Sequence, residues 1–303
     1  MKIYTNISYF MSTHGITYHN RIVLNIIGNW ISDGYDVIPY IVDSENIWYL
    51  VDTKLFAKYY IRKQFGSKDK YITNNLINMN EITENDIYYE IDTLWYLSCN
   101  WSQYYKKIIN TGCQFSGYLY YLRTEFTNNK MFMAWYKEYI HNIKTLFVSD
   151  QKIANSINNM CGNNVKIDIL SLENFKDSNF DDSLLPIDIG IKQIISEGMY
   201  ITCLFEPDKD VNNIARYNKI VQSHKNMKIL VILPADFQNT EFEKYLFRQK
   251  NIGYRIFILK NVSYYTILNV YRNCDKLLVP ANGDFCKFEI IHALQFNINI
   301  DEI

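Results

Sequence analysis

The sequence predicts an α/β protein with two Rossmann-like, doubly wound domains. Two observations lead to this prediction: strand and helix patterns alternate along most of the 303 residues, and a polar stretch between Ser171 and Pro186 interrupts them. A hydrophobic content of 48% and a formal net charge of −1 are typical of a globular chain with a sizeable core. We expect an N-terminal domain over residues 1–180 and a C-terminal domain over residues 181–303.

The start of the chain predicts a parallel β–α–β unit. Residues 2–9 alternate as a strand does, and residues 18–32 carry apolar side chains at the spacing of an amphipathic helix. Asp33-Gly34 ends that helix before a second strand over residues 35–42. Further strands are expected over residues 93–98, 117–122, 144–148 and 165–170. Further helices are expected near residues 54–64, 101–110, 131–141 and 150–160.

The same alternation resumes after the polar stretch. Strands are expected over residues 199–205, 227–233, 254–259 and 275–279, and helices over residues 211–224, 240–250 and 263–271. The turn Pro280-Ala-Asn-Gly283 then leads into a helix over residues 284–294 and a last strand over residues 296–300. A buried strand whose Gly-containing turn opens a helix points backbone N–H groups at one place, so this edge suits an anionic ligand.

Composition narrows the class of protein further. Six cysteines occur without a Cys-x-x-Cys pair, which predicts neither a zinc site nor a disulfide framework. No apolar stretch reaches the roughly 20 residues of a membrane helix, and the first residues do not form a signal peptide. We expect a cytoplasmic protein of a bacterium or of a virus-infected host cell, without an integral membrane segment. The sequence leaves its oligomeric state open.

The last segment resembles the donor-binding end of GT-B glycosyltransferases of the large retaining family four. In that family an acidic residue, seven others and a Glu open the helix, followed by Ala and a strand; here Asp284 and His292-Ala293 stand at these positions. The Gly15-Ile-Thr17 loop and the Asp33–Val37 strand entry resemble its first glycine loop and strand. The resemblance implies two Rossmann-like domains facing across a cleft, with a shortened C-terminus because the chain closes soon after the last strand.

The resemblance also implies an activity. It predicts a hexosyltransferase that moves a sugar from a nucleotide-diphosphate sugar, taken to be UDP-linked, to a glycan, lipid or protein acceptor. Transfer is expected with retention, without a metal and without a further cofactor. A non-catalytic GT-B-like subunit that partners an active enzyme is the alternative, because Leu204 replaces the family's Arg and His292 replaces its Glu.

The expected donor site lies in the C-terminal domain. The resemblance gives Lys209, between Asp208 and Asp210, a contact with the diphosphate, where cationic groups offset developing charge. Asp284 could accept hydrogen bonds from sugar hydroxyls, although it is equally interpretable as an N-cap. Gly283 ends the turn that points backbone N–H groups at the donor.

Two residues of the following helix complete the expected donor site. His292 would hold the ribose hydroxyls, or else be a structural histidine beside its apolar neighbours. Glu289, one turn earlier, is the residue that could substitute for the lost acid.

The loop around His14 and Gly15 is the expected catalytic contribution of the N-terminal domain. In the family it faces the donor phosphates and the acceptor, and either His14 or His19 could serve as a base near neutral pH. Arg123 and Glu125 close an expected strand and would either reach the acceptor or pair with each other.

The acceptor is the least determined part of the hypothesis. Residues 58–71 interleave cations with aromatic residues, which suits nucleic acid but equally suits the exposed face of a surface helix. The Gly15 loop also resembles that of the DNA α-glucosyltransferase of T-even-type phages, so modified DNA is an alternative acceptor.

Overall fold

The computed structural model describes most of the chain, as two compact units. The described residues are 1–13, 17–56, 67–91, 100–120, 137, 140–162, 165–175, 189–205, 212–233, 237, 239–260, 262, 264–281 and 286–303. One unit comprises Met1–Ser12 and Val23–Phe175, and the other comprises Thr13–Ile22 and Lys176–Ile303. The expected domain boundary at residue 180 falls within residues 176–188, outside the described part. In the described ranges, no helix is long and apolar enough to cross a membrane.

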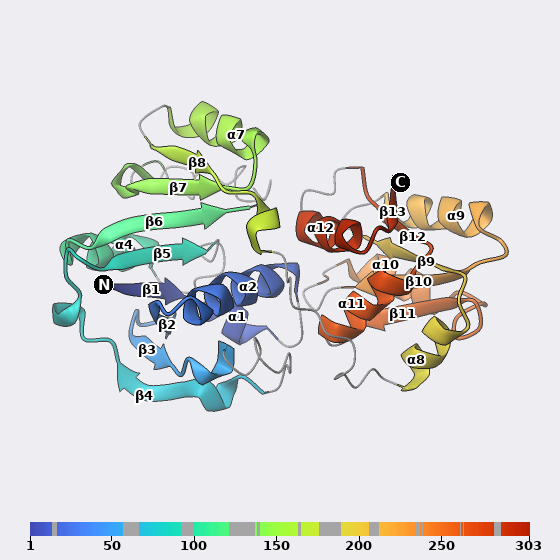
Figure 1. The fold of residues 1–303 in the computed structure, drawn as a ribbon, viewed down its shortest axis with the longest axis horizontal. Coiled ribbons are helices and arrows are strands. Elements are labelled where there is room, and N and C mark those ends of the chain that lie inside the picture. The colour runs from blue at the N-terminus through green and yellow to red at the C-terminus, as the bar shows by residue number, and fades with distance from the viewer. Residues whose placement is uncertain are drawn as a thin grey trace. The chain divides into compact units, whose positions relative to one another are not determined.

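The first unit contains an eight-stranded sheet with the order β4-β3-β2-β1-β5-β6-β7-β8 (Figure 1). Six neighbouring strands are parallel: β2 (Asp36–Val42), β1 (Lys2–Asn6), β5 (Ile87–Ile91), β6 (Gln114–Leu119), β7 (Thr145–Val148) and β8 (Ile167–Ile169). Two strands at one edge are antiparallel, β3 (Trp48–Val51) and β4 (Ile72–Leu76). Parallel strands need crossover connections, and helices supply them here.

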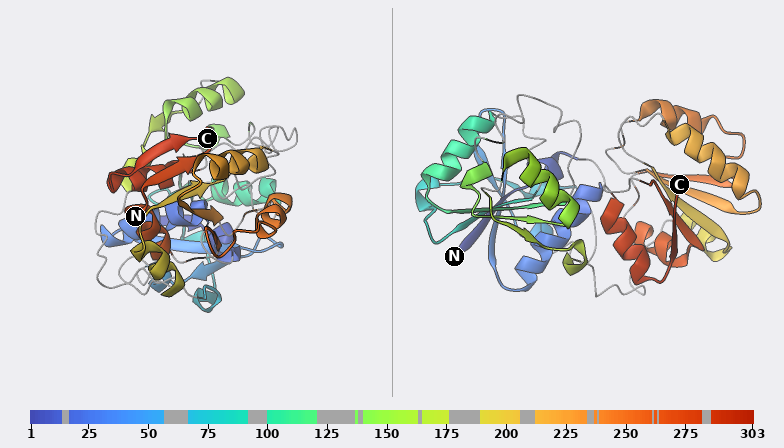
Figure 2. Two further views of the ribbon diagram at one scale, coloured as in Figure 1. Left: turned by 90° about the vertical axis from the view of Figure 1, so that its right-hand side faces the viewer. Right: turned by 90° about the horizontal axis from the view of Figure 1, so that it is seen from above.

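Helices cover both faces of this sheet. They include α1 (Ser8–Ser12), α2 (Tyr18–Ser32), α4 (Trp101–Asn110) and α7 (Gln151–Cys161). The α2 crossover joins β1 to β2, whereas the α4 crossover joins β5 to β6 in the opposite direction along the sheet. Right-handed crossovers in opposite directions place these two helices on opposite faces, as Figure 2 shows. Gly34 has a φ of 83°, a conformation that favours glycine, and it turns the chain from α2 into β2.

The second unit contains a five-stranded parallel sheet with the order β11-β10-β9-β12-β13. Its strands are β9 (Tyr200–Leu204), β10 (Lys228–Leu233), β11 (Ile256–Lys260), β12 (Lys276–Val279) and β13 (Asn299–Glu302). The central strands are continuous apolar runs because both of their faces are covered, and all five residues of β9 are buried.

The described helices that lie wholly in this unit are α8 (Ile189–Ser196), α9 (Asn213–Ser223), α10 (Thr240–Phe247), α11 (Tyr264–Asn273) and α12 (Lys287–Gln295). The crossovers through α9 and α10 run along the sheet from β9 to its β11 edge. Those through α11 and α12 run in the opposite direction, toward the β13 edge. The two pairs therefore lie on opposite faces, and α11 contacts α12 (Figure 2).

The predicted alternation of strands and helices is confirmed, with several corrections. The sequence interpretation did not include the antiparallel strands β3 and β4, the strand β5 or the helix α8. The strand expected over residues 93–98 lies outside the described residues. The described helix α12 begins at Lys287 rather than at residue 284, and β13 spans Asn299–Glu302 rather than residues 296–300.

The core of the first unit contains a hydrogen-bonded group of aromatic side chains. The Tyr104 hydroxyl lies 2.9 Å from both the Asn6 amide nitrogen and the Tyr40 hydroxyl, and it also contacts the Tyr88 hydroxyl. The Tyr105 hydroxyl donates to the buried Glu90 carboxylate at 2.6 Å. These polar groups are buried but paired, so the network favours one arrangement of the rings over others.

Candidate functional site

The candidate site is at the carboxyl edge of the five-stranded sheet, where α/β proteins usually bind ligands. Lys209 follows β9, and Gly283 and Asp284 follow β12, but all three lie outside the described residues. His14 and Gly15 also lie outside them. Glu289 and His292 are the expected site residues whose surroundings the structure describes, and both are on α12.

Glu289 and His292 are buried on the same side of α12. They are three positions apart, so their side chains are neighbours on the helix surface. Their exposed fractions are 0% and 1%. The ring of Phe288 packs edge-on against the His292 imidazole, with 4.5 Å between the centroids. A buried carboxylate needs a partner charge or hydrogen-bond donors, since isolated burial of an ion is strongly unfavourable.

Arg21 provides that charge. It comes from the first turns of α2, in the segment Thr13–Ile22 that belongs to the second unit. Its Nη1 forms an ion pair with Oε2 of Glu289, and its Nη2 lies 2.8 Å from Nδ1 of His292. Only 1% of the Arg21 side chain is exposed, so this ion pair is shielded from water and salt.

The arginine contact also defines the protonation of the imidazole. A guanidinium group can donate hydrogen bonds but cannot accept them, so Nδ1 of His292 must be the acceptor. The proton of the neutral imidazole is therefore on Nε2. His292 cannot be an imidazolium while the hydrogen bond to Arg21 persists.

Tyr271, on α11, holds the same carboxylate from a second direction. Its hydroxyl donates to Oε2 of Glu289 at 3.1 Å. The Arg21 guanidinium lies 5.9 Å from the Tyr271 ring centroid and 5.8 Å from that of Phe288, within cation–π range. Oε2 therefore has two partners, whereas Oε1 is buried without a hydrogen-bond partner among the described residues. A carboxylate oxygen in that position can accept one further hydrogen bond.

Sequence reasoning missed Arg21 and Tyr271. The apolar stripe of α2 predicted that one face of the helix is buried. At the start of the helix the polar face is buried as well: Thr17, His19, Asn20, Arg21 and Asn25 are at most 3% exposed. Several polar residues at the start of an otherwise apolar helix were the available signal. The pairing itself joins positions 271 apart, which no local pattern reveals. His19, the second histidine considered as a base, is buried in this group.

Lys68 is the other unusual titratable group, and it corrects the interpretation of residues 58–71. Residues 57–66 lie outside the described part, but residues 69–71 form a short 3-10 helix rather than the end of a surface helix. Lys68 is only 6% exposed, so it is not part of an exposed basic face. Its Nζ donates to the Phe10 carbonyl oxygen and lies 4.3 Å from the centroid of the Phe10 ring. Burial lowers the Lys68 pKa to about 7, and the negative charge of Asp69 offsets part of this decrease.

No group of three or more His, Cys, Asp or Glu side chains among the described residues could hold a metal ion. Asp208 and Asp210 lie outside those residues. They form an Asp-x-Asp spacing around Lys209, whereas the expectation of a metal-independent reaction had assumed that no such motif is present.

Comparison with known proteins identifies the fold. No protein-family model matches the sequence, and no curated protein is significantly similar to it. Similarity to solved structures extends over nearly the whole chain. The sucrose-phosphate synthase of Thermosynechococcus elongatus is 9% identical, with a TM-score of 0.61, over 99% of this chain and 80% of that one.

Two further solved structures give similar values. The UDP-GlcNAc 2-epimerase of Methanocaldococcus jannaschii, in complex with UDP-GlcNAc and UDP, is 12% identical with a TM-score of 0.58, over 99% of this chain and 82% of that one. The MnaA–UDP co-structure of S. aureus is 10% identical with a TM-score of 0.60, over 99% of this chain and 78% of that one. With its mostly parallel eight-stranded sheet and its parallel five-stranded sheet, the chain therefore has the GT-B fold that glycosyltransferases and related epimerases share.

Proposed function

We propose that this protein is a glycosyltransferase that uses a nucleotide-diphosphate sugar, with UDP sugars as the first candidates. It would transfer a hexosyl group with retention to a glycan, lipid or protein. Two of the similar structures contain UDP or a UDP sugar, which supports this choice of donor. The family-four resemblance of the last helix supports retention and the position of the donor.

The arrangement of Glu289 supports the proposal most directly. Arg21 and Tyr271 hold one of its carboxylate oxygens, and the other oxygen has no hydrogen-bond partner among the described residues. A hydroxyl of the ribose or sugar would supply the missing hydrogen bond, which is stronger when the acceptor is ionised. The Arg21 charge keeps that carboxylate ionised in a buried setting.

The remaining expected site residues have complementary roles in the proposed reaction. Lys209 would neutralise charge on the leaving diphosphate, and Asp284 would accept from sugar hydroxyls. His14 and Gly15 would approach the phosphates and the acceptor. In retaining transfer the leaving phosphate can take the acceptor proton, so the reaction does not need a strong base.

A second candidate function is isomerisation of a UDP sugar without an acceptor. The observation that favours it is the similarity over 99% of the chain to a UDP-GlcNAc 2-epimerase. Both candidates need the same donor site. They differ in whether product formation requires a second substrate.

The test begins with donor binding to the purified full-length chain. Thermal shifts with UDP-, GDP-, ADP- and CMP-sugars identify the nucleotide, and NMR of the products distinguishes transfer, hydrolysis and epimerisation. Acceptor screens include glycans and DNA with modified bases, and reactions with and without EDTA test whether Asp208 and Asp210 hold a metal. The proposal predicts nucleotide release that increases with an acceptor. Absence of binding and turnover with every donor contradicts it and favours an accessory subunit.

The residue-level test uses matched carboxylates. Glu289→Gln preserves the side-chain shape but removes the ionised acceptor, so the donor dissociation constant should increase at least about tenfold. Glu302→Gln, at the exposed end of β13, is the control and should bind donor as the wild type does. Equal donor affinity in both variants would show that Glu289 does not contact the donor.

A further inference from the structure

Exposed apolar side chains gather at the amino edge of the five-stranded sheet, where its strands begin. In parallel β–α–β units each helix runs back to this edge before the next strand starts. The large hydrophobic residues that are exposed in the described part of the second unit are all at this edge: Tyr254 (84%), Met199 (69%), Phe247 (59%) and Leu294 (56%). Single exposed apolar residues are ordinary, but such a gathering at one edge indicates a contact surface.

These side chains project from separate turns. Met199 and Tyr254 lie just before β9 and β11, whereas Phe247 and Leu294 are in the last turns of α10 and α12. The turn of Tyr254 has a defined shape, because the Asn251 carbonyl accepts hydrogen bonds from the N–H groups of Tyr254 and of the two residues after it, at 3.3, 3.0 and 3.0 Å. Tyr254 is therefore presented from a held position.

The same edge carries positive charge. Lys228 is paired there with Glu197. Asp275, before β12, is an exposed acid at this edge. Three exposed basic residues lie on the turns and form no ion pair with a described residue: Lys225, Arg248 and Lys250. Among the described residues of the amino edge, cations therefore outnumber acids beside the exposed apolar side chains.

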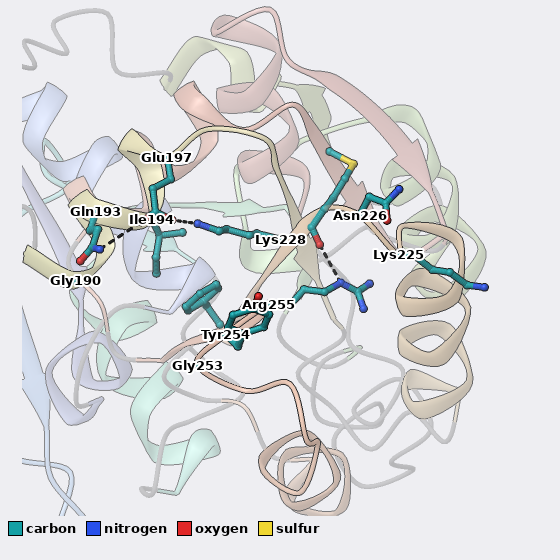
Figure 3. Close-up of a pocket in the computed structure, with 12 residues that line it drawn as sticks. Gly190, Gln193, Ile194, Glu197, Lys225, Asn226, Lys228, Gly253, Tyr254 and Arg255 are labelled. Atoms are coloured by element: carbon teal, nitrogen blue, oxygen red, sulfur yellow. Dashed lines mark hydrogen bonds and ion pairs between the residues drawn. The ribbon is translucent and has the colours of Figure 1, made fainter.

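Arg255 holds the turn that carries Lys225. Its Nε donates to the Met227 carbonyl at 3.1 Å, and its Nη2 donates to two carbonyls at and just beyond the end of α9, at 2.9 and 2.8 Å. A cation is favourable at such a helix end. Figure 3 shows the Lys225 side chain pointing outward, on the other side of Arg255 from Tyr254. The aromatic ring and the cation thus lie at separate points of the edge.

The surface between these points is hollowed. A cavity of about 750 Å³ lies between α8 and the beginnings of β10 and β11 (Figure 3). Ile194, Met227 and Phe257 contribute apolar walls to it. A rigid protein partner needs a continuous surface of complementary shape, which separate turns around a hollow do not provide. A lipid surface is deformable, so it can fill the hollow and cover each projecting side chain.

We propose that the amino edge of the second unit docks on a membrane surface that contains anionic lipids. The four exposed apolar side chains enter the boundary between headgroups and acyl chains, where a tyrosine is favourable because its ring is apolar and its hydroxyl is polar. The three exposed basic residues contact the lipid phosphates, and each such residue strengthens binding about fivefold.

The two kinds of contact act together. Apolar insertion or electrostatic attraction alone gives weak and reversible binding, whereas the combination gives stable docking. The amino edge is opposite to the carboxyl edge of the same sheet, so docking does not involve the candidate donor site. The inference therefore does not rest on the proposed glycosyltransferase function.

The test is co-sedimentation of the full chain with vesicles of two compositions: phosphatidylcholine alone, and phosphatidylcholine with an equal amount of phosphatidylglycerol. Binding to the anionic vesicles should be at least about tenfold tighter and should weaken as the salt concentration rises. Hydrogen–deuterium exchange of residues 247–255 should slow when anionic vesicles are added, whereas exchange in α4 of the first unit should not change.

Charge variants connect the binding to the cations of this edge. The triple variant Lys225→Ala/Arg248→Ala/Lys250→Ala should bind anionic vesicles at least about tenfold more weakly. The matched control replaces three exposed lysines elsewhere by Ala and changes the net charge equally: Lys106, Lys137 and Lys219. The control should bind within about twofold of the wild type, because its lysines do not face the lipid.

Apolar variants test insertion separately. Phe247→Ser/Tyr254→Ser should weaken binding to anionic vesicles severalfold, whereas Ile72→Ser/Leu76→Ser, at exposed positions of β4, should not. Melting temperatures show that each variant is folded. Thermal shifts with UDP sugars, measured without vesicles, should equal those of the wild type, so failure of docking is distinguishable from failure of the donor site.

Three results would overturn the assignment. Equal binding to both kinds of vesicle, or equal losses in the site and control variants, would remove the lipid contact. A dimer in sedimentation velocity that Phe247→Ser/Tyr254→Ser abolishes would assign the edge to a second copy of the chain. Salt-sensitive binding to heparin and vesicles alike, unaffected by Phe247→Ser/Tyr254→Ser, would assign it to polyanions in general.

Discussion

Nη2 of Arg21 lies 2.8 Å from Nδ1 of His292, and Nη1 of the same guanidinium forms an ion pair with Glu289. One cation thus connects the two residues of α12 that the sequence had indicated separately. Sequence reasoning treated His292 as the residue that replaces the acid of the family motif, and Glu289 as a possible substitute for that acid. The structure shows that they belong to one buried network, in which Glu289 supplies the negative charge and His292 stays neutral.

Loss of Arg21 should strongly destabilise the protein. Arg21→Met leaves the Glu289 carboxylate buried without its charge partner, so the free energy of unfolding should fall by about 3–5 kcal/mol. Chemical denaturation measures this change. The exposed Arg248→Met serves as the control and should change stability by less than about 0.5 kcal/mol. The double variant Arg21→Met/Glu289→Gln should recover part of the loss, and a loss equal to the sum of both single variants would contradict the coupling.

A variant of Tyr271 should lower stability, whereas a variant of Glu289 should also raise the donor KM. Tyr271→Phe removes the hydroxyl that donates to Oε2 of Glu289, so stability should fall by about 1 kcal/mol. The donor KM should stay close to the wild-type value because Oε1 is unchanged. Glu289→Gln, in contrast, should raise that KM at least about tenfold. Parallel measurement of KM and denaturation separates the two effects, and a KM raised equally in both variants would count against a ligand contact through Oε1.

Lys209 and Asp284 should affect turnover more than stability. Lys209→Ala and Asp284→Ala each remove a proposed contact to the donor, so turnover should fall at least about tenfold. Lys219→Ala and Asp275→Ala change exposed residues of the same types on the same unit, and they should retain wild-type turnover. Steady-state assays with the donor found in the screen measure these rates, with melting temperatures recorded alongside. Wild-type turnover in both site variants would show that the donor site lies elsewhere.

Regular patterns in the sequence predicted the architecture well. The helices α2 and α4 have the predicted bounds because an apolar stripe defines each and Asp33-Gly34 ends the first. The antiparallel strands β3 and β4 were missed because they are short, and the edge strand β4 reads Ile-Thr-Asn-Asn-Leu, which is largely exposed and polar. Periodicity cannot indicate such strands, since their stability comes from pairing with a neighbour.

The candidate site was less predictable, for a physical reason. The motif spacing on α12 drew attention to Glu289 and His292, and both are in the buried network. Their partner Arg21 lies near the other end of the chain, and the ion pair exists only because the fold brings the two segments together. A local pattern contains no information about such a pairing. The polar residues at the start of an otherwise apolar helix were the single indication in the sequence.

The Tyr104 hydroxyl should contribute measurably to the stability of the first unit. Burial raises its pKa well above the ordinary value, so the group stays protonated. Tyr104→Phe removes a partner of Asn6, Tyr40 and Tyr88, and buried polar groups left unpaired should cost about 1–3 kcal/mol. Tyr89→Phe is the matched control on β5, because no described residue hydrogen-bonds the Tyr89 hydroxyl. A similar loss of stability in both variants would contradict a specific role of the network.

Lys68 should give the protein a characteristic dependence of stability on pH. Burial lowers its pKa from 10.5 to about 7 in the folded protein. The unfolded chain therefore binds more protons than the folded chain between about pH 7 and pH 10.5, and stability from this group increases with pH across that window. Below about pH 7 the lysine is charged in both states, so the full desolvation penalty applies. Above about pH 10.5 it is neutral in both states and the penalty is absent.

Comparison with Lys68→Met isolates this contribution from other titrating groups. The variant lacks the titration, so its stability relative to the wild type should decrease as the pH rises from about 7 to about 10, by a few kcal/mol. Denaturation curves at several pH values measure the difference, and NMR of isotope-labelled lysine reports the pKa directly. Lys70→Met, at a neighbouring exposed lysine, should give a difference from wild type that does not change with pH. A pH-independent difference for Lys68→Met would show that the buried amine keeps its ordinary pKa, and that the Phe10 carbonyl and ring compensate for its burial.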